Sequence, residues 1–214
     1  MNVIKNFIAQ IRVAIWTIGF SYIVILSLLI LAELISVFND IDIGIFTRDP
    51  AFTLRANPFT GFISHIGILI WSGTVSICFF TSIIIKKMGD TKISQFLFFS
   101  GLFILLLLLD DLFMFHEEYF YMFFHVPEKG VYLGYLILSI IYTLKFRSLL
   151  AKTEYAILLI ACGFFALSMG LDWFLETFNT IFEDGFKLFG ITTLCIYFTR
   201  TCLTQLRLLK GVDI

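Results

Sequence analysis

Six long apolar stretches alternate with short polar ones along the chain. A helix needs about 20 predominantly apolar residues to cross the hydrocarbon core of a bilayer, and all but the fourth stretch reach that length. We therefore predict an all-α fold, a polytopic membrane helix bundle with six transmembrane helices. The predicted spans run over residues 13–38, 59–85, 93–120, 131–146, 154–177 and 182–207.

Composition supports this interpretation. Hydrophobic residues make up 59% of the chain and charged residues 14%, whereas soluble domains carry about 25% charged residues. The spans take up most of the sequence, so we predict a single integral membrane domain over residues 1–214. Within residues 1–12 the apolar side chains share one helical face, which predicts a short interfacial helix ahead of the first span. The long connection over 39–58 is compatible with a binding loop and with a plain surface excursion.

Basic residues predict the orientation in the membrane. Cytoplasmic flanks of membrane proteins carry an excess of lysine and arginine. We therefore place both termini in the cytoplasm and the protein in the cell (inner) membrane. Eleven of the 15 basic residues fall on the side of the termini: Lys5, Arg12, Lys86, Lys87, Lys92, Lys145, Arg147, Lys152, Arg200, Arg207 and Lys210.

Acidic residues gather on the opposite side, and three predicted spans end in one. Glu33, Asp110 with Asp111, and Asp172 each follow an apolar run of about 17–20 residues, which rises about 26–30 Å and reaches the outer boundary of the hydrocarbon. Ionisable side chains in membrane segments are costly, and they usually face the protein interior or water and serve a function. Asp110, Asp111 and Asp172 are therefore the candidate catalytic residues.

Histidines on the same side of the membrane add metal-ligand chemistry. Carboxylates with imidazoles suit zinc, and carboxylate-rich sites suit calcium or manganese. The predicted ligands of a divalent metal ion (Zn, Mn or Ca) are His65, Asp110, His116, Asp172 and Glu183. Adjacent side chains lie about 100° apart around a helix, so we expect Asp110 and Asp111 to face different neighbours. Glu183 also fits a structural role, because it precedes Lys187 by four residues at a helix start.

Three functions remain open from the sequence. The first is a metal-dependent membrane hydrolase acting on a lipid or small amphiphile, in which a carboxylate takes a proton from metal-bound water. The second is an ion or proton-coupled transporter or channel. The third is an accessory subunit that holds a haem through His65 and His116. Whether the protein is an enzyme stays open, as does its oligomeric state. The lipid bilayer is the expected partner, and a net charge of −1 gives no reason to expect nucleic acid.

Overall fold

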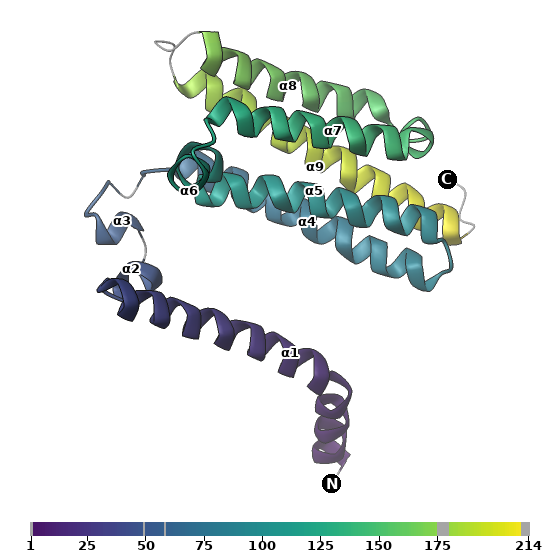
Figure 1. Cartoon of the computed structure of the whole chain (residues 1–214). Helices are drawn as coiled ribbons and strands as arrows, with labels where there is room; N and C mark the ends of the chain where they lie inside the picture. The colour runs from purple at the N-terminus through teal and green to yellow at the C-terminus, as the bar shows by residue number, and fades with distance from the viewer. Residues whose placement is uncertain (1, 49, 58, 175–179, 211–214) are drawn as a thin grey trace. The chain divides into compact units, whose positions relative to one another are not determined.

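Every regular element in the described part of the chain is a helix, which confirms the predicted all-α class (Figure 1). The computed structural model describes residues 2–48, 50–57, 59–174 and 180–210. The chain divides into two compact units, residues 1–60 and residues 61–214, and each is described by itself.

The first unit consists of one long helix followed by two short ones. Helix α1 (Asn2–Asn39) is predominantly apolar from Gly19 onward, and α2 (Gly44–Thr47) and α3 (Pro50–Thr53) lie in the long connection. Hydrogen bonds shape the chain after α1: the Ser36 hydroxyl donates to the Ile41 carbonyl at 2.6 Å. Residues 2–12 are helical and continuous with α1, and their position on the membrane surface stays a prediction.

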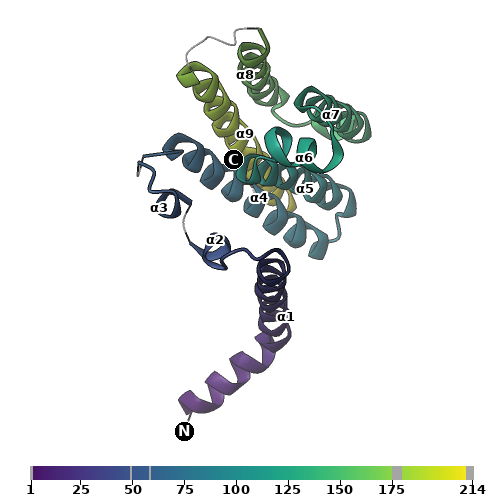
Figure 2. The ribbon, with the colours of Figure 1, turned by 60° about the vertical axis from the view of Figure 1, so that its left-hand side comes forward.

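The second unit is a bundle of five long helices that lie side by side (Figure 1; Figure 2). Helix α4 packs against both α5 and α9, and α9 packs against α8. A π-helical turn, η1 (Phe115–Tyr119), and the short helix α6 (Phe120–Phe124) connect α5 to α7. The long helices are α4 (Phe62–Lys87), α5 (Thr91–Phe113), α7 (Glu128–Leu150), α8 (Tyr155–Phe174) and α9 (Thr180–Lys210).

A shared apolar core fixes α4, α5, α8 and α9 at one level. Trp71 of α4, Ile104 of α5 and Ile191 of α9 are buried together in it. The Trp71 ring stacks on Phe165 of α8 with ring centroids 5.9 Å apart. Because Trp71 is only 3% exposed, these four helices are held by packing as well as by their connections.

Four helices are long and apolar enough to cross a membrane, among the residues that the structure describes: residues 19–39 of α1, and α4, α5 and α7. The apolar part of α8, Tyr155–Leu171, is shorter. Helix α9 has the length of a span, but Glu183, Asp184 and Lys187 near its start and Arg200 near its end interrupt its apolar sequence.

Two predicted boundaries need correction. The third predicted span, 93–120, ends early because α5 stops at Phe113 and the chain turns through Met114 in the left-handed conformation. The fourth, 131–146, is too short, because α7 begins at Glu128 and continues to Leu150. The aromatic residues after Met114 therefore belong to the connection between α5 and α7.

The two ends of the bundle differ in charge. The ends of α5 and α8 and the starts of α4, α7 and α9 lie together, and we call this the acidic end, defined by Asp110, Asp111, Glu128 and Glu183. The opposite end is the basic end, where Lys86 and Lys87 close α4 and Arg147 lies in the last turn of α7.

Candidate functional site at the acidic end

The site begins where α5 ends. Met114 adopts φ +53°, which breaks the helix, and its backbone N–H donates to the Asp110 carbonyl. The Asp110 carboxylate then accepts the backbone N–H of His116 through Oδ1 at 2.9 Å. Asp110 is 5% exposed. The break takes the backbone N–H of His116 out of the regular helix, and the buried Asp110 carboxylate accepts its hydrogen bond instead.

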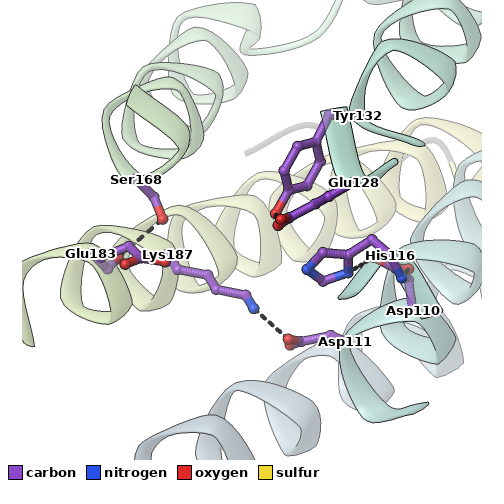
Figure 3. Close-up of polar contacts among 8 residues, drawn as sticks. All are labelled: Asp110, Asp111, His116, Glu128, Tyr132, Ser168, Glu183 and Lys187. Carbon is purple, nitrogen blue, oxygen red and sulfur yellow. Dashed lines mark hydrogen bonds and ion pairs between the residues drawn. The ribbon is translucent and has the colours of Figure 1, made fainter. Parts of the chain in front are cut away.

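The same carboxylate orients the His116 side chain (Figure 3). Asp110 Oδ2 lies 2.7 Å from His116 Nδ1, and both side chains are almost fully buried. A carboxylate beside one imidazole nitrogen favours a proton on that nitrogen in general, and the other ring nitrogen of His116 then lies on the side away from Asp110. Tyr132 of α7 faces the imidazole, with ring centroids 5.3 Å apart. The Asp110–His116 pair thus joins α5 to η1, and α7 packs an aromatic ring against it.

Helix α7 adds further polar groups beside this pair. The Tyr132 hydroxyl donates to Glu128 Oε1 at 3.0 Å, and in Figure 3 the Glu128 carboxylate lies on the side of His116 that faces away from Asp110. Tyr135, nearly one turn further along α7, lies within electrostatic range of Asp110. The Asp110 carboxylate itself contacts an imidazole and a backbone amide, both from His116.

Asp111 points to a different helix. It forms an ion pair with Lys187 of α9, and the Asp111 side chain is 9% exposed while that of Lys187 is 38% exposed. A cavity of about 20 Å³ borders the pair and is also lined by Ser64 and Asp184, which is room for about one water molecule. The ammonium of Lys187 already neutralises Asp111, so this carboxylate has its counter-ion within the chain.

The predicted site residues divide into those that meet and those that do not. Asp110 and His116 meet directly. His65 is exposed, and its ring lies over Gly61 at the start of α4. Glu183 is half-buried, and its backbone carbonyl accepts a hydrogen bond from Ser168 of α8 at 3.0 Å. The side chain of Asp172 lies outside the described residues. Within the described part of the chain, no group of three or more His, Cys, Asp or Glu side chains is arranged to hold a metal ion.

Sequence reasoning missed the tyrosines and the role of Lys187. Tyr132 and Tyr135 stand among apolar residues and carry no charge, so attention to acids and histidines passes over them. Their spacing, four and seven residues after Glu128, is the signal that could have found them. The spacing of Glu183 and Lys187 indicated a pair on one helix, and it gave no sign that Lys187 also forms an ion pair with Asp111 of α5.

Fold and site together define an all-helical protein of membrane type, with a buried Asp–His pair at one end of its bundle. Within that class, residues 21–201 match a family described as "Domain of unknown function (DUF8692)", and the chain belongs to this family. No curated protein and no solved structure matches the chain.

Proposed function

We propose that this member of DUF8692 is a six-span membrane enzyme in which His116, oriented by Asp110, accepts a proton from water to hydrolyse a lipid or small amphiphile. The buried Asp110–His116 contact is the observation that carries the proposal. A histidine oriented by a carboxylate is the usual arrangement of a general base, and such a base contributes about 10²–10⁴-fold to a rate.

Packing supports the count of six spans. Helices α8 and α9 share their core with α4 and α5, which are both long and apolar enough to cross a bilayer. Helices packed along their length occupy the same depth, so α8 and α9 would cross with them. The charged residues of α9 near Glu183 then lie at the membrane boundary, where ionisable groups are tolerated.

Charge supports the orientation. The basic end carries Lys86, Lys87 and Arg147 in last helical turns, and an excess of such residues marks the cytoplasmic side. The acidic end would then face the exterior of the cell membrane. An amphiphile in the outer leaflet would reach His116 from that side with its headgroup in water.

The test is a hydrolysis assay with the full chain in lipid nanodiscs. Defined phospholipids, glycerides and N-acyl amphiphiles are offered one class at a time, and released products are measured by mass spectrometry. We expect product from one class with the wild type and a loss of about 10²-fold or more with His116→Gln. The matched control is His125→Gln, which changes an exposed histidine at the same end. Equal rates for wild type and His116→Gln would overturn the proposal.

A divalent metal remains part of the hypothesis and has its own measurement. Metal analysis of purified wild type, Asp110→Ala and Asp172→Ala gives the ratio of Zn, Mn or Ca to protein. A ratio near one that falls in both variants assigns a metal centre to the site. A ratio near zero, with thermal stability indifferent to added metal, would leave His116 as an unaided base.

Transport is the second candidate, because one face of α7 carries a line of half-buried hydroxyl groups, from Tyr132, Tyr135, Ser139 and Tyr142. A path across a bilayer needs polar groups along its length. The haem-holding subunit stays a prediction; of its two histidines, His65 is exposed and His116 is in contact with Asp110.

A further inference from the structure

The outer surface of the α5–α7 pair is polar at the basic end and apolar further in. The two helices run in opposite directions, so the start of α5 lies at the same end of the bundle as the end of α7 (Figure 1). On each helix one row of exposed side chains follows a spacing of three or four residues, which keeps the row on a single helical face. The row on α5 consists of Lys92, Gln95, Phe99, Leu102 and Leu106. The row on α7 consists of Leu138, Ile141, Lys145, Ser148 and Lys152, the last of them just past the helix. We call the two rows together the lysine face.

A contact between an ammonium and an aromatic ring joins the two rows. Lys145 Nζ of α7 lies 3.9 Å from the ring centre of Phe99 of α5. The same ammonium lies 5.3 Å from the ring centre of Phe146, and the Phe99 and Phe146 rings are themselves 6.0 Å apart. A cation is attracted to the face of an aromatic ring. The positive charge of Lys145 is therefore held between the helices at a defined place.

The lysine face carries three positive charges and no negative one. In the part of the chain that the structure describes, the acids at the basic end are Asp90 and Glu154, and both have partners elsewhere. Asp90 Oδ1 accepts the backbone N–H of Ile93 at 3.0 Å at the start of α5. Glu154 forms an ion pair with Arg200 of α9. The lysine face is therefore complementary to an anion, and clusters of basic residues beside membrane helices attract anionic lipid headgroups.

Toward the middle of the bundle the same two rows become apolar. Leu106 lies seven residues beyond Phe99, about 10 Å of helix, which falls within the roughly 15 Å of hydrocarbon in one leaflet. A phospholipid has the same order of chemistry, with a charged headgroup followed by acyl chains. The exposed fractions of the apolar members are 46% for Leu102, 37% for Leu106, 43% for Leu138 and 55% for Ile141.

We propose that the lysine face binds one anionic phospholipid of the leaflet at the basic end. Its phosphate lies among the ammonium groups of Lys92, Lys145 and Lys152, and its acyl chains lie along the leucines and the isoleucine. The proposal needs α5 and α7 to cross the membrane. It does not depend on hydrolysis, because His116 lies at the opposite end of the bundle.

Native mass spectrometry of the full chain, released from detergent micelles, tests the proposal. Phosphatidylglycerol and phosphatidylcholine with identical acyl chains are titrated separately, and the fraction of protein that carries one lipid gives a Kd for each. Lys145→Gln removes the charge at the centre of the lysine face. The matched control is Arg207→Gln, which removes an exposed charge at the same end from α9, a helix that packs against α4 and α8.

We expect wild type to bind phosphatidylglycerol about tenfold more tightly than phosphatidylcholine, because each nearby lysine strengthens the attraction to an anionic headgroup. Lys145→Gln should weaken phosphatidylglycerol binding about fivefold and leave phosphatidylcholine binding unchanged. Lys145→Arg should retain the preference, since a guanidinium keeps the charge and also stacks on an aromatic face. Arg207→Gln should change the Kd of either lipid by less than about twofold, because its charge lies outside the lysine face.

Three results would overturn the proposal. Equal Kd values of wild type for the two lipids would remove the preference for an anion. Equal losses in Lys145→Gln and Arg207→Gln would show a diffuse charge without a site. Displacement of bound phosphatidylglycerol by millimolar inorganic phosphate would show that the lysines take a free anion in place of a lipid. A melting temperature like that of wild type, measured without added lipid, shows that a variant is folded, and Lys92→Gln repeats the measurement at a second position.

Discussion

Asp111 of α5 and Lys187 of α9 form an ion pair although they lie on helices that are not neighbours in sequence. We predict that Lys187→Met destabilises the bundle by about 1–3 kcal/mol, because it leaves the Asp111 carboxylate buried without a counter-ion. Removing one partner of a fully buried ion pair destabilises a protein by more than this. The loss is smaller here because the Lys187 side chain is 38% exposed and solvent screens part of the interaction.

A double-mutant cycle isolates the pair. Asp111→Asn with Lys187→Met should cost less than the sum of the single changes, because the double variant buries no unpaired charge. Thermal or denaturant unfolding in detergent micelles gives the four stabilities. Additive losses would show that the two side chains do not depend on each other.

Met114 offers a test of the break after α5. Its φ of +53° is a conformation that costs a residue with a Cβ atom about 1 kcal/mol or more relative to glycine. Met114→Gly should therefore stabilise the protein by about 1 kcal/mol. Leu112→Gly, two residues earlier in the regular helix and similarly exposed, should destabilise it by about the same amount. Losses of equal size at both positions would mean that Met114 is helical in solution.

Apolar periodicity and charge were sufficient to predict the class of fold. A run of about 20 apolar residues has few alternatives to a membrane helix. Both ends of α4 and the start of α5 therefore lie within a few residues of the predicted spans. The break at Met114 was missed because neither Gly nor Pro marks it. After the break, the Asp110 carboxylate accepts the backbone N–H of His116, a contact that the sequence does not reveal.

The candidate site was predicted in part. The angle of about 100° between adjacent helical side chains placed Asp110 and Asp111 against different neighbours, and the structure agrees, with His116 and Lys187 as those neighbours. The identity of a partner from another helix was beyond the sequence, because it depends on how α5 and α9 pack. His65 illustrates the same limit, since its exposed position with the ring over Gly61 depends on how the chain enters α4.

The contact between α8 and α9 depends on the missing side chain of Gly190. A Cβ atom there would meet the Phe165 ring at 2.9 Å, and that ring is held by stacking on Trp71. Gly190→Ala should destabilise the protein by about 1–3 kcal/mol through overpacking. Gly163→Ala is the matched control, because nothing lies within 4 Å of its added Cβ, and it should stabilise α8 by up to about 1 kcal/mol. Unfolding experiments give the stability of both variants. No loss of stability in Gly190→Ala would mean that the α8–α9 interface is loose enough to accept the added methyl group.

A second ion pair at the basic end should make stability depend on pH. Glu154, just before α8, accepts hydrogen bonds from the Arg200 guanidinium of α9, one of them at 2.5 Å. Those hydrogen bonds hold the pKa of the Glu154 carboxyl below its ordinary value. A lowered folded-state pKa contributes stability that is complete above the unfolded value of about 4.3 and is lost as pH falls through the folded value.

Comparison of wild type with Glu154→Gln measures this contribution. We expect wild type to have the higher melting temperature at pH 7 and the difference to close below about pH 4, where the carboxyl becomes protonated. Both side chains are exposed, so the difference should be small and should shrink in about 1 M salt. Arg200→Gln should show the same closing because it removes the same pair. A difference that stays constant from pH 7 to pH 3 would mean that Glu154 stabilises the start of α8 without its charge.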